Sequence, residues 1–155
     1  ILSRQNLPII DKSRYADPSS SKSVVAQGAY VIRECAGKPS ALILATGSEV
    51  AIAIAAAEQL EVKGISVRVI SFPCFEWFDD QPESYRKSIL PDDVPLRVSV
   101  EAGIAQPWFK YLGSFGKAIS LEHFGASASA NKLFTEFGFT PENIVSTVQD
   151  LLSKR

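Results

Sequence analysis

The sequence contains no methionine, one histidine and two cysteines among its 155 residues. The cysteines, Cys35 and Cys74, form no Cys-x-x-Cys pair, and together with the single His123 they supply no recognisable set of metal ligands. We expect both thiols to be buried, in a protein of a reducing compartment. A natural chain starts with methionine unless it is trimmed, so the first residue, Ile1, predicts a piece of a longer polypeptide.

Long hydrophobic runs and an excess of charge of either sign are also missing. The longest apolar run, residues 50–57, falls far short of the roughly 20 residues that cross a bilayer, and no signal peptide is visible. The net charge is −1, so no basic surface is expected to attract nucleic acid or an anionic membrane. We therefore predict a cytoplasmic globular domain with no nucleic-acid or membrane partner.

Complete catalytic and nucleotide-binding motifs are absent as well. The glycine fingerprint Gly-x-Gly-x-x-Gly, the P-loop and the Gly-x-Ser-x-Gly elbow do not occur. The turn Thr46-Gly47-Ser48 precedes a helical pattern whose first amides could hold an anion, so a stand-alone nucleotide- or metabolite-binding module is one alternative. His123 has only Glu122 as an acidic neighbour, and we interpret it as an exposed residue at the end of a strand.

Strand-like and helical segments alternate along the main part of the chain. Residues 41–45 form a continuous apolar run, as in a strand that is buried on both faces. Ser48 is expected to cap a helix that ends at Gly64, and Thr140 with Pro141 predicts the start of the last helix. The expected strands are 30–35, 41–45, 67–71, 96–100 and 117–121, with further helices at 83–90, 107–112 and 131–137. This order predicts an α/β fold whose mostly parallel sheet is covered on both faces.

Two segments are rich in aromatic residues. The first, Phe72–Phe78, follows a predicted strand and is interpreted as a loop, and the second contains Trp108, Phe109 and Tyr111. Dense aromatic side chains usually lie in a core or an interface, where each buries a large area. We expect both segments to pack within the domain and partly against another domain or subunit.

The N-terminal part of the chain is organised differently. Residues 11–23 are rich in Ser, Asp and Lys and predict a linker, which leaves residues 1–10 as the last strand of a preceding domain and residues 24–155 as the main domain. Arg4 follows an apolar pair that resembles the end of a strand. Its planar guanidinium is suited to bind a phosphate or a carboxylate, and a surface ion pair with a neighbouring acid is the alternative.

Seven short motifs, taken in order, resemble the C-terminal part of transketolases. They are Ser3-Arg4-Gln5-Asn6-Leu7-Pro8, Gly28-Ala29-Tyr30-Val31, Ala45-Thr46-Gly47-Ser48-Glu49-Val50, Gln81-Pro82-Glu83-Ser84-Tyr85-Arg86-Lys87-Ser88-Ile89-Leu90-Pro91, Glu101-Ala102-Gly103, Phe124-Gly125-Ala126-Ser127-Ala128 and Phe137-Gly138-Phe139-Thr140. Each motif is weak alone, and together they span nearly the whole chain.

The resemblance implies part of a homodimeric transferase of the pentose phosphate pathway. Such an enzyme moves a two-carbon ketol unit from a ketose phosphate to an aldose phosphate, using thiamine diphosphate and Mg²⁺ or Ca²⁺. Residues 1–10 would end its pyrimidine-binding domain, and residues 24–155 would form its C-terminal domain. The implied fold is a three-layer α/β/α sandwich with a mostly parallel, mixed five-stranded sheet whose first strand is antiparallel. The family's Ser-Arg-Gln-Asn motif binds the sugar phosphate, so the resemblance assigns that role to Arg4.

The family's Gly-Asp-Gly motif, its catalytic glutamate and its active-site histidines have no counterpart in this sequence. The resemblance therefore implies a structural and interface domain that has no catalytic residue, binds no cofactor or metal and is inactive alone. Its partners would be the remaining transketolase domains and sugar phosphates. Related thiamine enzymes, such as deoxyxylulose-phosphate synthase, share this type of domain and are a further alternative. The motifs that include Arg4 and Phe124 favour transketolase.

Overall fold

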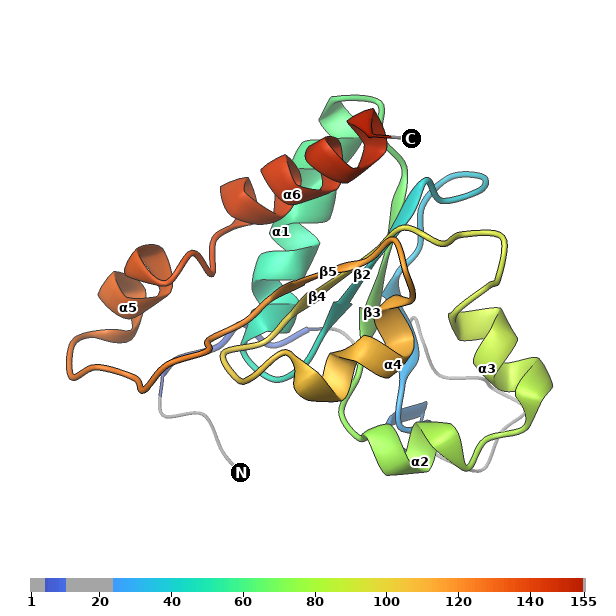
Figure 1. Cartoon of the computed structure of the whole chain (residues 1–155), viewed down its shortest axis with the longest axis horizontal. Helices are drawn as coiled ribbons and strands as arrows, with labels where there is room; N and C mark the ends of the chain where they lie inside the picture. Colours follow the sequence, from blue (N-terminus) through green and yellow to red (C-terminus); the bar gives the residue numbers. More distant parts are fainter. Residues whose placement is uncertain (1–4, 11–23, 155) are drawn as a thin grey trace.

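A mixed sheet forms the centre of the molecule. The structure, a computed structural model, describes residues 5–10 and 24–154. The strands are β1 (Tyr30–Arg33), β2 (Ala41–Ala45), β3 (Val67–Ser71), β4 (Arg97–Val100) and β5 (Lys117–Ile119), in the spatial order β1-β3-β2-β4-β5. β1 is antiparallel to β3, whereas β3, β2, β4 and β5 are parallel (Figure 1). The predicted mixed, mostly parallel five-stranded sheet is confirmed.

Helices cover both faces of this sheet. One face carries α1 (Glu49–Val62) and α6 (Pro141–Ser153), and the other carries α2 (Phe75–Asp79), α3 (Glu83–Ile89), the 3-10 turn η3 (Gln106–Trp108) and α4 (Phe109–Leu112) (Figure 1). A further 3-10 turn, η2 (Val24–Gln27), precedes β1. The result is the predicted three-layer α/β/α sandwich.

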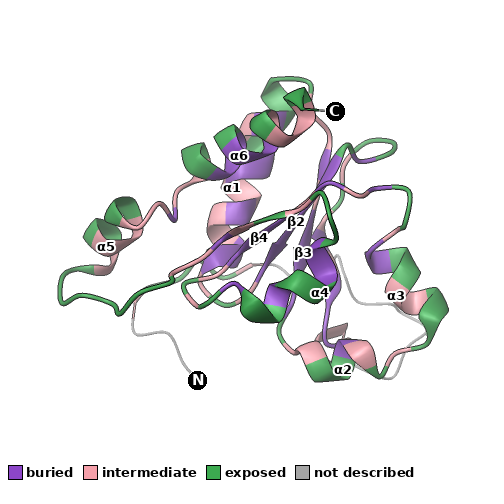
Figure 2. Ribbon diagram, viewed as in Figure 1, coloured by how far each residue is buried: buried purple, intermediate pink, exposed green. Residues whose placement is uncertain are grey.

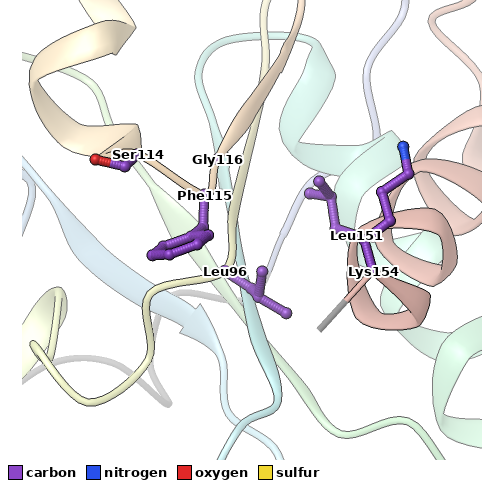
Figure 3. Close-up of a pocket in the computed structure, with 6 residues that line it drawn as sticks. All are labelled: Leu96, Ser114, Phe115, Gly116, Leu151 and Lys154. Carbon is purple, nitrogen blue, oxygen red and sulfur yellow. The ribbon is translucent and has the colours of Figure 1, made fainter.

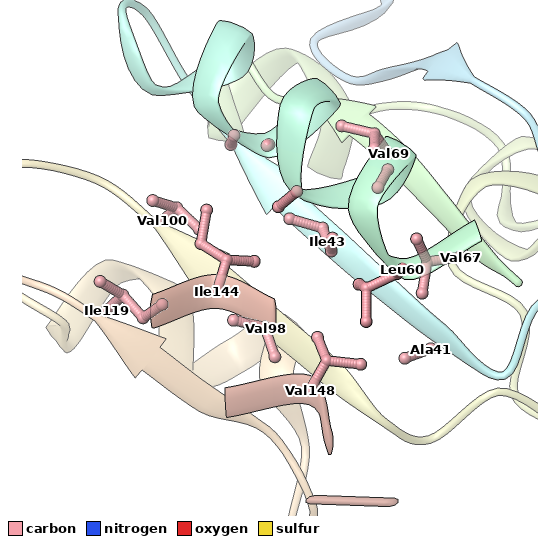
Figure 4. Packing of buried hydrophobic residues seen from close by; sticks show 14 of the residues in the cluster. Ala41, Ile43, Leu60, Val67, Val69, Val98, Val100, Ile119, Ile144 and Val148 are labelled. Atoms are coloured by element: carbon pink, nitrogen blue, oxygen red, sulfur yellow. The ribbon is translucent and has the colours of Figure 1, made fainter. Parts of the chain in front are cut away.

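β2 shows why a continuous apolar run predicts a central strand. Its five residues are all buried, and successive side chains point to opposite faces. Ala41, Ile43 and Ala45 contribute to the core beneath α1 and α6, which we call the first core. Figure 4 shows Ala41 and Ile43 in it. Leu42 and Leu44 contribute to the core beneath the helices of the other face, which we call the second core. Both faces of the strand must be apolar because both are covered.

The helices of the first layer follow their sequence signals closely. On α1, Ala53, Ala56 and Ala57 are fully buried, and such small side chains let the helix axis lie close to the sheet. The larger Ile54 on the same helix is only half-buried. Gly64 follows α1 with φ +74°, the left-handed conformation expected after a helix.

α6 begins as predicted. The Thr140 side chain accepts a hydrogen bond from the backbone N–H of Asn143, 3.2 Å away, and Pro141 occupies the first turn. Ile144 and Val148 are fully buried against the sheet, and both are drawn in Figure 4. The capped start at Thr140 and the buried side chains of Ile144 and Val148 therefore determine how α6 packs on the sheet.

The aromatic segment after β3 departs from the prediction. Residues 75–79 form a short helix, α2, where a loop was expected. Five residues cannot hold a helix by local propensity, so packing supplies the stability. Phe72 lies 4.9 Å from Phe78 and 5.6 Å from Trp108, ring centroid to ring centroid, inside the second core. The expected packing within the domain is thus confirmed for part of each segment, whereas Trp77 and Phe109 are exposed.

A less compact segment extends from the end of β5. Residues 122–129 are all exposed, and α5 (Ala130–Glu136) buries no residue fully (Figure 2). Phe134 and Phe137 nevertheless pack partly against the first core. Figure 1 shows this segment reaching away from the sheet, and we call residues 121–137 the arm.

The N-terminal division remains a prediction. Residues 5–10 form neither helix nor strand, and Ile10 packs against the first core. Arg4 and the predicted linker 11–23 lie outside the described residues.

Candidate functional site at the carboxyl edge of the sheet

The carboxyl ends of parallel strands are where ligands bind in open α/β sheets, above all where the strand order reverses. Here that point lies between β2 and β4, because the chain passes from β2 to β3 on one side and later to β4 on the other. Two segments meet there: the turn Thr46-Gly47-Ser48, for which anion binding was the alternative, and Glu101-Ala102-Gly103 after β4.

The turn after β2 does not have the predicted cap. Ser48 has helical dihedral angles, φ −66° and ψ −28°, and its side chain makes no capping hydrogen bond. The Ser48 hydroxyl instead donates to Glu49 Oε1 at 3.0 Å. Ser48 already has helical backbone angles, whereas a capping residue is typically extended, so the predicted N-cap is wrong.

The buried Glu49 determines which ligands could bind between the carboxyl ends of β2 and β4. Its side chain is 4% exposed, and its carboxylate accepts hydrogen bonds from its own backbone N–H and from that of Ala102. Burial raises the pKa of Glu49, and the negative charge of Glu101 raises it further. The protein's own carboxylate therefore already occupies the N-terminus of α1, where a phosphate would otherwise bind.

Two further carboxylates hold the neighbouring loops. Glu101 accepts a hydrogen bond from the indole N–H of Trp108 at 2.6 Å, and Trp108 is fully buried. Glu122 accepts from the backbone N–H of Ala105 at 2.8 Å and from the hydroxyl of Ser120 at 2.9 Å. The carboxyl edge is thus acidic, with each carboxylate committed to internal donors, and it would repel a phosphate.

The described residues also do not fit a metal ion with a diphosphate. Within residues 5–10 and 24–154, no three His, Cys, Asp or Glu side chains lie close enough to share an ion. The Thr46-Gly47-Ser48 turn, which was the alternative anion site, contacts the carboxylate of Glu49. We assign no chemical step to a cofactor on this surface.

His123 lies where the sequence placed it, exposed in the arm just after β5. Its ring packs edge-on against Phe137 at 5.0 Å, and Nδ1 lies 2.8 Å from the carbonyl oxygen of Phe124. Its sequence neighbour Glu122 is bonded elsewhere. The arrangement offers no base or nucleophile pair.

The two cysteines are free, but the prediction that they are buried is wrong. Cys35 and Cys74 are both partly exposed, because each lies just outside a strand end and not within the sheet. Burial and the charge of Glu34 raise the pKa of the Cys35 thiol. A thiol with a raised pKa is a poor nucleophile, so Cys35 is not a catalytic candidate.

A shallow hollow of about 370 Å³ lies at the opposite, amino edge of the sheet. Figure 3 shows Leu96 and Phe115 on one side of it and Leu151 with Lys154 on the other. Only Lys154 brings a charge, so this hollow contains no group of convergent polar side chains of the kind that orients a small ligand.

Arg4, the one predicted site residue, lies outside the described residues, so its binding role stays a prediction. Sequence reasoning missed the buried Glu49 and its acidic neighbour Glu101. Glu49 carried a signal, since it begins a helix directly after a buried strand, but nothing in the sequence indicates that residues 101–103 fold over it.

Comparison with known proteins agrees with the fold. The family model described as "Transketolase-like TK C-terminal domain" matches residues 28–140. The transketolase of Aquifex aeolicus (strain VF5) is 50% identical over 148 residues, which are 96% of this chain and 21% of that protein. The solved transketolase from Leishmania mexicana has a TM-score of 0.76 at 41% identity, covering 84% of this chain and 18% of that one.

A transketolase from Pichia stipitis, solved in complex with sedoheptulose 7-phosphate, has a TM-score of 0.75 at 38% identity and covers 83% of this chain and 18% of that one. This chain therefore spans about a fifth of the length of the relatives it matches. Since the family model matches most of the chain and the identity reaches 50% over nearly all of it, the chain belongs to the transketolase family and corresponds to its C-terminal domain.

Proposed function

We propose that this chain completes a transketolase whose reacting groups lie in the rest of the polypeptide. The observation that carries the proposal is the 50% identity to a transketolase over 96% of this chain, against only 21% of the relative. The described residues supply no nucleophile with a base and no metal-binding group, which supports a structural and interface role.

The proposed reaction of the whole enzyme is the transfer of a two-carbon ketol unit from a ketose phosphate to an aldose phosphate, as in the pentose phosphate pathway. Thiamine diphosphate with Mg²⁺ or Ca²⁺ would supply the chemistry of this transfer. The acidic carboxyl edge around Glu49 and Glu101 supports the view that this cofactor binds outside the present domain.

Arg4 is the proposed contact to substrate. Its guanidinium remains charged at any physiological pH and can hold a phosphate dianion through paired hydrogen bonds. The motif Ser3-Arg4-Gln5-Asn6 supports this role, as does the sugar phosphate bound by the Pichia stipitis relative. Arg4 would then bind substrate from the edge of the neighbouring domain.

The proposed setting is a cytoplasmic homodimer with sugar phosphates as substrates and with neither nucleic acid nor membrane as partner. The two free thiols support a reducing compartment, and the net charge of −1 does not favour nucleic acid. In the described part of the chain, none of the helices has the length and hydropathy that a transmembrane helix needs.

A turnover assay tests the proposal in two arms. The isolated chain, given thiamine diphosphate, Mg²⁺, a ketose phosphate and an aldose phosphate, is expected to show no activity. A chimera in which this chain replaces the matched fifth of the Aquifex aeolicus transketolase is expected to be active. Activity of the isolated chain, or a folded chimera that loads cofactor without turnover, would refute the proposal.

The role of Arg4 is tested in the same chimera. Arg4→Ala removes a charge-assisted pair of hydrogen bonds, so KM for a phosphorylated sugar is expected to rise by about tenfold to a hundredfold. Turnover of a donor that lacks the phosphate should stay unchanged. Arg14→Ala, in the predicted linker, is the matched control. Equal losses for phosphorylated and unphosphorylated donors would show that Arg4 does not bind the phosphate.

A further inference from the structure

Large exposed hydrophobic side chains gather in the segments that follow the carboxyl ends of β3, β4 and β5. Trp77, Ile104, Phe109 and Phe124 are 53, 52, 63 and 98% exposed. Single exposed hydrophobic residues need no explanation, but several in adjacent segments at one edge of a sheet indicate an interaction surface.

Charge is missing from two of these segments, the ones that follow Glu101 after β4 and Glu122 after β5. Residues 102–109 and residues 123–131 contain no Lys, Arg, Asp or Glu, although 21% of the chain is charged. The backbone N–H of Leu121 donates to the carbonyl of Gly103 at 2.8 Å, which ties the two segments together at their base. Depletion of charge is the compositional mark of the buried centre of an interface.

The opposite edge of the sheet has exposed hydrophobic side chains as well, Val62 and Phe115, and it also carries ion pairs. Near the amino ends of β2 and β3, Lys38 pairs with Asp93 at 2.6 Å, and Arg68 pairs with Glu34 at 2.8 Å. Such exposed ion pairs are typical of a surface that stays in water.

The backbone of the arm is also available to a partner. In the part of the chain that the structure describes, residues 125–128 make no hydrogen bond to any other residue. Their side chains are Gly, Ala or Ser, so another backbone can approach closely. Backbone N–H and C=O groups without a partner are satisfied by water now and by a docked chain once water is excluded.

We infer that the carboxyl-edge surface, formed by residues 102–109 and 123–131, docks onto the preceding part of the same transketolase polypeptide. This inference rests on the proposed function, which places about four-fifths of the enzyme outside this chain. The segment of residues 5–10 lies at the same end of the molecule as the carboxyl ends of β4 and β5 (Figure 1). The described residues nearest to the preceding polypeptide therefore lie at this end of the molecule.

Hydrogen–deuterium exchange tests the inference directly. The isolated chain is compared with the chimera in which it replaces the matched fifth of the Aquifex aeolicus transketolase. Amides of residues 102–109 and 123–131 are expected to exchange about tenfold or more slowly in the chimera, because docking removes them from water. Amides of residues 34–40, at the amino edge, should exchange at equal rates in both proteins.

Two matched variants separate docking from folding. Phe124→Ser and Val62→Ser each remove an exposed hydrophobic side chain, 98% and 89% exposed, at opposite edges of the sheet. Neither should change the melting temperature of the isolated chain. In the chimera, Phe124→Ser should abolish most of the slowed exchange in residues 123–131, and Val62→Ser should leave it intact.

A second measurement does not depend on the chimera. The isolated chain is mixed with Aquifex aeolicus transketolase that lacks its matched fifth, and binding is followed by sedimentation. The wild-type chain is expected to bind, and Phe124→Ser about tenfold more weakly, as for the central residue of an interface. No binding, or equal binding of both, would overturn the inference.

The outcomes distinguish this inference from the proposed function. An active chimera without slowed exchange at the carboxyl-edge surface overturns the inference and leaves the function standing. Slowed exchange in an inactive chimera supports the surface and counts against the function. Slowed exchange in the isolated chain that grows with its concentration shows that a second copy binds there, and this also overturns the inference.

Discussion

Among single residues, Gly28 carries the most demanding backbone position. It lies between η2 and β1 with φ +82°, a conformation that residues with a side chain rarely adopt. A Cβ atom at this position would lie 2.2 Å from the backbone nitrogen of Phe78 and 2.5 Å from the carbonyl oxygen of Cys74. These contacts are with backbone atoms of the α2 region, which cannot move aside as a flexible side chain can.

Gly28→Ala is expected to lower the free energy of unfolding by at least about 3 kcal/mol, through backbone strain together with overpacking. Gly64→Ala is the matched control, since Gly64 has φ +74° but nothing within 4 Å of the added Cβ. The control should cost only about 1 kcal/mol. Urea denaturation measures both, and equal losses would show that the close approach to α2 is unimportant.

The buried Glu49 makes stability depend on pH. Its pKa is raised in the folded protein, so the neutral form favours folding below pH 4.5, and this contribution is lost as pH rises through the raised pKa. Glu49→Gln cannot ionise and loses nothing over that range. Its stability relative to wild type should therefore improve from pH 4.5 to pH 7.5, by about 1.4 kcal/mol for each unit by which the pKa is raised.

Urea unfolding of wild type and Glu49→Gln at several pH values checks this prediction. The amide also changes the hydrogen bonds with Ser48 and Ala102, which shifts the whole curve by a constant amount. The informative quantity is therefore the change of the difference with pH. Parallel curves would mean that Glu49 ionises as readily in the folded as in the unfolded chain.

At the scale of elements, the sequence predicted those whose signals are local. The apolar run of β2, the glycine after α1 and the Thr140-Pro141 start of α6 all lie where expected. α2 was missed because its helix depends on packing among aromatic rings distant in sequence. The Ser48 cap was wrong because Ser48 itself has helical backbone angles, and its hydroxyl donates to Glu49.

The residues of the candidate site likewise differ in whether a local sequence pattern reveals them. Arg4 is found through a motif within six consecutive residues, which a sequence displays directly. The acidic cluster of Glu49 and Glu101 depends on two loops that meet only after the sheet has formed. Side chains brought together by tertiary structure leave no local pattern to read.

Thr140→Ala tests the cap of α6. The Thr140 hydroxyl oxygen accepts from the Asn143 N–H, so its removal leaves that donor at the first turn without its partner. We expect a loss of about 1 kcal/mol in the free energy of unfolding. Ser146→Ala, on the exposed face of the same helix, should change stability by less than about 0.5 kcal/mol. Equal losses in the free energy of unfolding of both variants would show that Thr140 is not a specific cap.

For the whole molecule, the two cores are separate sets of side chains on the two faces of one sheet. The strands contribute to both, as β2 does with Ile43 on one face and Leu44 on the other. Neither helical layer can keep its core if the sheet is lost. The domain should therefore unfold in one cooperative transition.

Thr140→Ala also tests this cooperativity, because the change lies in the α6 layer while Trp108 lies in the other core. Tryptophan fluorescence and far-ultraviolet circular dichroism should give the same lowered urea midpoint for the variant. Two separate midpoints, with the fluorescence midpoint unchanged, would show that the layers unfold independently.

The two edge strands of the sheet, β1 and β5, affect how this domain behaves on its own. β1 has four residues and a register shift after Val31, and β5 has three residues with Lys117 exposed at its start. Short, kinked or charged outer strands are poor templates for strand addition by another molecule. A domain bounded in this way resists edge-to-edge aggregation, which allows it to be prepared and stored apart from a larger enzyme.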